Sequence, residues 1–95
     1  MARAASYTQG DYRILWASQL FQQGHEQAAR SQLERAEHAY NLAPPMSVTY
    51  YNLGVAYQQL GDRQKARTLL ERFISLEPNG PGADVARQLL AQLAR

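Results

Sequence analysis

Few residues in this chain of 95 have side chains suited to catalysis or metal binding. The chain has no cysteine, and its two histidines, His25 and His38, have no pair of carboxylates spaced to converge with them. Metal sites need several ligands, and acid–base catalysis needs an oriented donor and acceptor. The sequence also lacks a glycine-rich phosphate loop, a G-x-S-x-G nucleophile and an H-E-x-x-H motif. We therefore predict a protein that is not an enzyme, with no catalytic residue, no cofactor and no metal site.

The aromatic and cationic residues are more typical of helix packing and of a solvated surface than of nucleic-acid binding. Trp16 and the six tyrosines are better explained by interhelical packing than by stacking on bases. The arginines of two segments are interleaved with Glu34 and Glu71, which favours local ion pairs; they are Arg30, Arg35, Arg63, Arg67 and Arg72. Lys and Arg number 10 against 8 Asp and Glu, without a dense basic tract, so no nucleic-acid partner is predicted.

The composition favours one all-α domain over residues 1–95. Leu, Ala and Gln account for 38 residues, whereas the strand formers Val, Ile and Thr account for 8. A chain of this length has a modest core with little room for a buried catalytic cavity. No apolar run reaches the ~18 residues of a membrane span, and residues 1–5 lack the apolar core of a signal peptide. Cytoplasm and periplasm are equally allowed, and the Ala, Arg, Gln and Leu bias is typical of a bacterial source.

The sequence contains an internal repeat with a lag of 37 residues. When residues 22–35 are aligned with residues 59–72, eight of fourteen positions are identical, where chance gives about one. The identical residues of the first copy are Gln22, Gly24, Gln27, Ala29, Arg30, Leu33, Glu34 and Arg35. Each copy has two apolar-periodic stretches around a glycine, which predicts a helix–turn–helix unit.

The second copy indicates where its two helices begin and end. Ser47 is the expected N-cap of a helix over residues 47–60, Gly61 the left-handed stop and Asp62 the next N-cap. The following helix runs to about residue 76, before Pro78-Asn79-Gly80-Pro81. The predicted apolar faces are Tyr50, Leu53, Tyr57 and Leu60 in the first helix, and Ala66, Leu69, Leu70, Phe73 and Leu76 in the second.

Three further helices complete a five-helix prediction. They are expected over residues 11–22, 26–41 and 83–94, the first two separated by Gly24 and His25. Their apolar residues are Leu15, Trp16 and Leu20; Ala29, Leu33, Ala36 and Tyr40; and Ala86, Leu89, Leu90 and Leu93. Within the single domain, repeat 1 is placed at residues 10–46, repeat 2 at 47–80 and a C-terminal capping helix at 81–95.

The second copy resembles the tetratricopeptide repeat, whose pattern is W-x2-L-G-x2-Y, then A-x3-F and a closing proline. The resemblance rests on Tyr50, Leu53, Gly54, Tyr57, Gly61, Asp62, Ala66, Leu70 and Pro78. It implies a TPR-like α-solenoid of about two and a half repeats, in which Gly54 and Ala66 are small where two helices cross. The first copy departs from the pattern, because Trp16, Ala17 and Leu20 replace its Leu, Gly and Tyr.

The resemblance also implies a concave groove that takes a peptide or helix of a partner protein. Helical spacing opposite Leu53 and Tyr57 assigns this face in repeat 2 to Val48, Asn52, Val55 and Gln59. The matching positions are Asp11, Leu15, Ser18 and Gln22 in repeat 1, and Gly82, Ala86, Leu89 and Leu93 in the last helix.

Asn52 has the amide donor and acceptor for a peptide backbone, a role that an Asn at this place has in several family members. Relatives that capture a C-terminal carboxylate carry cationic or amide side chains at the positions of Ile14, Ser18, Asn52, Gly82 and Ala86. Only Asn52 matches, so we do not expect that clamp. An apolar, amide-bearing face suits an amphipathic helix or an extended segment.

These inferences predict a protein–protein interaction module that acts as an adaptor or scaffold. Leu15, Val48 and Val55 are expected to contact apolar side chains of the partner. Asn52, Gln22 and Gln59 are expected to meet its polar groups, with Leu89 and Leu93 extending the surface.

Two alternatives stay open. Such arrays normally need about three repeats, which favours self-association through apolar residues at incomplete ends, namely Ile14, Phe21, Leu90 and Leu93. The other is an RNA-binding helical-repeat protein, whose affinity for single strands falls with salt.

Overall fold

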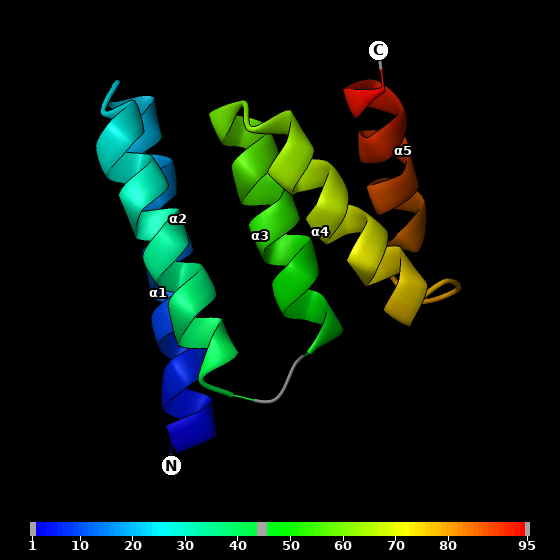
Figure 1. The fold of residues 1–95 in the computed structure, drawn as a ribbon, viewed down its shortest axis with the longest axis horizontal. Coiled ribbons are helices and arrows are strands. Elements are labelled where there is room, and N and C mark those ends of the chain that lie inside the picture. The colour runs from blue at the N-terminus through cyan, green and yellow to red at the C-terminus, as the bar shows by residue number, and fades with distance from the viewer. Residues whose placement is uncertain (1, 44–45, 95) are drawn as a thin grey trace. The chain divides into compact units, whose positions relative to one another are not determined.

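The computed structural model of the chain describes residues 2–43 and 46–94 (Figure 1). This part of the chain contains five helices and no strand: α1 (Ala2–Gln22), α2 (Glu26–Asn41), α3 (Ser47–Leu60), α4 (Arg63–Leu76) and α5 (Ala83–Leu93). The prediction of an all-α repeat architecture is confirmed. The predicted bounds of α2, α3 and α4 are also confirmed, whereas α5 ends one residue before the predicted position. No described helix has both the length and the apolar character needed to cross a membrane.

The chain consists of two compact units, residues 1–45 and residues 46–95. In the first unit α1 packs against α2; in the second, α3 packs against α4 and α4 packs against α5. Each unit therefore contains one helical hairpin, as the repeat of 37 residues predicts, and the second unit adds α5. The boundary between the units lies next to the boundary predicted between the two repeats. The assignment of one domain with a capping helix stays a prediction.

The α3–α4 hairpin depends on a close approach at Gly54. A Cβ atom at this residue would lie 2.8 Å from Cγ and 2.9 Å from Cδ2 of Leu70. Leu70, Ala66 and Tyr57 are fully buried around this approach. The predicted role of Gly54 and Ala66 as small residues at a helix crossing is therefore confirmed.

The α1–α2 hairpin uses a different glycine for the same purpose. A Cβ atom at Gly10 would lie 2.6 Å from Cδ1 of Tyr40, a buried residue whose hydroxyl donates a hydrogen bond to the Asp11 carboxylate. The predicted start of this helix at residue 11 was wrong, because α1 continues through Gly10 back to Ala2. A glycine inside a helix costs about 1 kcal/mol relative to alanine, and here it allows the Tyr40 ring to reach α1.

The predicted inner face of α1 was also wrong. Gly10 faces α2, and the buried Ala17 lies two turns further along the same face. Leu15 is 66% exposed and Trp16 is 41% exposed. The Trp16 ring makes an edge contact with Tyr12 at 6.5 Å and lies 5.8 Å from the Arg13 guanidinium. These contacts lie within α1, and the interhelical packing of Trp16 stays a prediction.

The turn into α4 follows the sequence prediction, but the N-cap of α3 does not. Gly61 has the left-handed φ of 92°, and the Asp62 carboxylate accepts a hydrogen bond of 3.2 Å from the backbone N–H of Lys65. At α3 the N-cap is Met46 in an extended conformation, and Ser47 is the first helical residue. The prediction that Ser47 is the N-cap was wrong, since the cap lies one residue earlier. The Ser47 hydroxyl instead donates a hydrogen bond of 3.1 Å to the Glu77 carboxylate.

The substitution Gly54→Val is expected to lower the free energy of unfolding by about 2 kcal/mol, because the added methyl groups overpack the contact with Leu70. The matched control is Gln59→Val, which adds the same β-branched side chain at an exposed position of α3 and is expected to stay within about 0.5 kcal/mol of the wild type. Urea denaturation followed by circular dichroism measures both. Equal losses in the two variants would contradict the close approach at Gly54.

Candidate functional site

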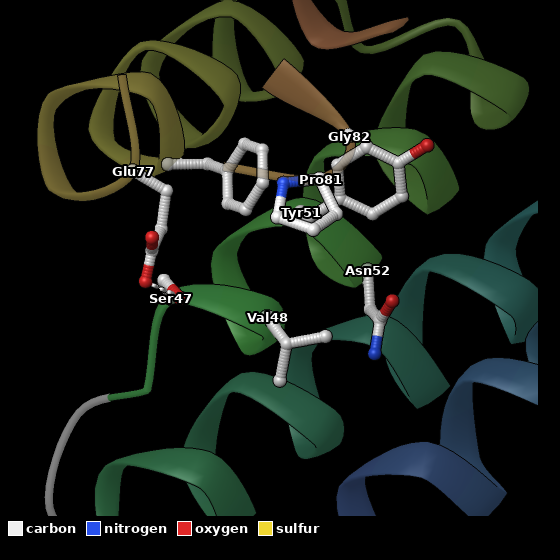
Figure 2. Close-up of a pocket in the computed structure, with 8 residues that line it drawn as sticks. Ser47, Val48, Tyr51, Asn52, Glu77, Pro81 and Gly82 are labelled. Carbon is white, nitrogen blue, oxygen red and sulfur yellow. Dashed lines mark hydrogen bonds between the residues drawn. The ribbon is translucent and has the colours of Figure 1, made fainter. Parts of the chain in front are cut away.

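The second unit has a cavity of about 480 Å³ beside the first two turns of α3 (Figure 2). It is lined by residues of α3, of the end of α4 and of the loop before α5: Ser47, Val48, Tyr51, Asn52, Phe73, Glu77, Pro81 and Gly82. All eight belong to the part of the chain that the structure describes, and all lie in the second unit. The volume is within the range of small-ligand and side-chain pockets, about 300–1,000 Å³.

Two aromatic rings and a glycine form the apolar part of this cavity. The rings of Tyr51 and Phe73 have centroids 5.1 Å apart and are tilted by 59°, and Phe73 is buried. Gly82 has a φ of 88°, and a Cβ atom there would lie 3.5 Å from Cζ of Phe73 and 3.7 Å from Cε2 of Tyr51. The left-handed backbone at Gly82 thus brings the loop before α5 into contact with both rings.

The polar groups of the cavity lie at its two ends. Figure 2 shows Glu77 and Ser47 at one end and Asn52 at the other, with Val48 between them. The Ser47 hydroxyl donates a hydrogen bond of 3.1 Å to Oε1 of Glu77, and Oε2 lies close to Gly80. Among the eight lining residues, all of them described, Glu77 alone is charged. The cavity therefore combines aromatic walls with one carboxylate and one carboxamide.

Three of the positions predicted for the groove face, Val48, Asn52 and Gly82, lie together in this cavity. Val48 is 45% exposed, and Asn52 is half-buried. Val55 and Gln59 follow on α3 outside the cavity, the first half-buried and the second exposed. In α5, Leu89 is half-buried, whereas Leu93 is 7% exposed and belongs to the core of the second unit. Burial in the core removes the Leu93 side chain from the surface that a partner reaches.

The other four predicted groove residues lie on α1, in the first unit. Leu15 and Gln22 are exposed and Ser18 is half-buried. Asp11 is exposed, and its carboxylate accepts a hydrogen bond from the Tyr40 hydroxyl. Their part in a binding groove stays a prediction.

A depression of about 520 Å³ in the first unit has a mixed polar lining: Gln9, Arg13, Ser31, Glu34, Arg35, His38, Ala39 and Leu42. It contains none of the predicted groove residues, and its mixed charges single out no ligand. His25 precedes α2 as an N-cap without a side-chain hydrogen bond to the helix. Among the described residues, no group of three or more His, Asp or Glu side chains is arranged to hold a metal ion.

Sequence reasoning missed five of the cavity residues. Tyr51 lies at position i+3 from Val48, so helical spacing on α3 contained the signal for it. Phe73 was assigned to the core, and it is both buried and part of the cavity wall. Glu77 and Pro81 come from a loop whose approach to α3 has no local signal in the sequence, and Ser47 was interpreted as a helix cap.

Residues 47–79 match the family model of the tetratricopeptide repeat. This segment contains all of α3 and α4 and six of the eight cavity residues; Pro81 and Gly82 follow it. Comparison with curated proteins and with solved structures gave no significant match. The residues that match the family model and six of the eight cavity residues therefore belong to the same segment, the α3–α4 hairpin with its C-cap.

The substitution Gly82→Ala is expected to lower the free energy of unfolding by about 1 kcal/mol, because an alanine is strained at positive φ. Gly61→Ala is the matched control, since Gly61 has a similar φ but nothing within 4 Å of the added Cβ atom. Both variants should lose similar stability in thermal melts. Only Gly82→Ala should shift the ring proton resonances of Tyr51 and Phe73; unchanged ring resonances would contradict the position of Gly82 against the cavity.

Proposed function

Residues 47–79 are a tetratricopeptide repeat, and from this premise we propose that the chain binds a peptide or helix of a partner protein against α3, as an adaptor or scaffold. Tetratricopeptide repeats are generally protein–protein interaction modules without catalytic activity. The proposal for this chain is binding through the cavity of the second unit, with no chemical step.

The cavity beside α3 is the observation that carries this proposal. Its apolar walls accept an apolar side chain of the partner, since Val48 is 45% exposed at the opening and Tyr51 and Phe73 lie behind it. The Asn52 carboxamide has both a donor and an acceptor, so it can pair with a C=O and an N–H of an extended or helical backbone. Peptide-recognition grooves commonly combine a pocket for an apolar side chain with hydrogen bonds to the peptide backbone.

The test is selection of peptides from a random heptapeptide phage library on the full chain. Selected peptides are expected to lose at least tenfold in affinity on Val48→Arg, because the long side chain fills the opening of the cavity. Val85→Arg is the matched control: Val85 is 47% exposed, lies on α5 and does not line the cavity. Isothermal titration calorimetry gives the affinities, and unchanged helicity and melting establish that both variants fold. Peptides that bind both variants as tightly as the wild type would place the binding surface elsewhere.

A second candidate function, self-association, is favoured by an apolar face of α1. Tyr12, Leu15 and Trp16 are exposed on this face, which we call the α1 apolar face. Of the described side chains on α1, Asp11 and Arg13 are the charged ones, and both are engaged with α2. Asp11 accepts from Tyr40, and Arg13 donates a hydrogen bond of 2.7 Å to Gln32. The apolar side chains of this face can pack against a second copy of the chain.

Self-association through this face predicts a mass above the monomeric 10.7 kDa, as measured by light scattering over a range of concentrations. Leu15→Glu is expected to restore the monomer, because like charges then face each other across a two-fold axis. The control is Leu42→Glu, since Leu42 is 67% exposed against 66% for Leu15 and lies at the end of α2. A wild-type mass of 10.7 kDa at millimolar concentration would eliminate this candidate.

A further inference from the structure

We propose that the cavity beside α3 selects partner segments in which an arginine or lysine side chain adjoins an apolar one, with the Glu77 carboxylate as the acceptor of the cation. This inference rests on the proposed function, because it names the chemistry of the segment that binds. It follows from the charge, the aromatic walls and the helix ends around the cavity.

The electrostatic character of the cavity is negative at the Glu77 end. Glu77 is the C-cap of α4, so it follows directly on the end of the helix where the helix dipole is negative. No other residue among the eight that line the cavity is charged. A cation placed at this end meets the carboxylate of Glu77.

The N-terminus of α3 lies at the same end of the cavity, and a helix N-terminus attracts anions rather than cations. The carboxylate already occupies this position, since Oε1 accepts the hydroxyl hydrogen bond of Ser47, the first residue of α3. An acidic ligand that approached the same helix end would meet the Glu77 charge. The cavity is therefore unsuited to an acidic segment or a phosphate group at this end.

Three arginines of the second unit contact groups outside the cavity. Arg72 lies over the Tyr50 ring at 5.7 Å, and Arg63 donates to the Leu93 carbonyl at 3.1 Å. Arg87 pairs with Asp84 at 3.2 Å and also donates to the Pro78 carbonyl. None of these arginines lines the cavity, and the hydrogen bond that Glu77 accepts there comes from the neutral Ser47 hydroxyl. The negative charge at this end of the cavity is therefore not offset by a cation of its own lining.

The walls suit the stem and the head of a long cationic side chain. The methylene groups can pack on Val48 and Pro81, while the charged head reaches Glu77. Tyr51 is a half-buried aromatic residue of the lining, and an aromatic ring attracts a cation and can stack on a planar guanidinium. Because Ser47 donates to Oε1, Oε2 of Glu77 can accept an N–H of the ligand, and the fork of an arginine can reach both oxygens where lysine cannot.

The test uses the full chain and heptapeptides selected from a random phage library. Arginine and lysine are expected to be over-represented, and the selected peptides should bind Glu77→Gln about fivefold more weakly. Glu71→Gln is the matched control, because Glu71 is an exposed α4 residue outside the cavity. Replacement of the peptide arginine by citrulline, a neutral side chain of the same shape, should give a similar loss on the wild type and none on Glu77→Gln. The citrulline peptide needs no variant protein, so it tests the inference even if Glu77→Gln does not fold.

The two proposals fail in different ways. Peptides that require Val48 but lack basic residues, and that bind Glu77→Gln as tightly as the wild type, overturn the cation preference and leave the binding function intact. Selection that yields no peptide sensitive to Val48→Arg overturns both. Enrichment of acidic peptides whose affinity rises on Glu77→Gln overturns the cation preference directly.

Discussion

The close approach of two antiparallel helices at a residue without a side chain is the constraint on which the second unit depends. At Gly54 the backbone of α3 comes near enough to α4 for Leu70 to pack directly on it, and a side chain at this position would overlap the leucine. Tyr57 and Ala66 are fully buried beside this crossing. Because packed helices settle into a few discrete arrangements, this crossing fixes the orientation of α3 against α4. Every group of the cavity that comes from these two helices is positioned by it.

An antiparallel hairpin also sets the chemistry of its open end. The N-terminus of α3 and the C-terminus of α4 lie at the same end, as Figure 1 shows, and their dipoles are opposite. Ser47 and Glu77, thirty residues apart, therefore meet at the helix ends and form a hydrogen bond. The polar end of the cavity is a product of hairpin geometry, and the loop that carries Pro81 and Gly82 covers the side next to it.

The sequence predicts those features that local interactions determine. The end of α3 and the start of α4 were predictable because Gly61 and Asp62 form a stop and a cap within five residues. Val48 and Asn52 were predictable because helical spacing places them opposite Leu53 and Tyr57. The contact of Gly10 with Tyr40 joins residues thirty positions apart, and the cavity joins three separate segments. Such long-range contacts leave no periodic signal, so the sequence did not indicate Glu77 or Pro81.

The two hairpins differ in where the glycine at their close helix contact lies along the first helix. The second unit has Gly54 at the crossing and buries its neighbour Leu53, whereas the corresponding residues of the first unit are Ala17 and Trp16. An alanine carries the Cβ atom that Gly54 lacks, and in the first unit the close approach occurs two turns earlier, at Gly10. The Trp16 ring, at the position that corresponds to Leu53, is 41% exposed and lies near Tyr12 and Arg13 of its own helix. A single repeat pattern thus gives two hairpins that make their closest contact at different positions along the first helix.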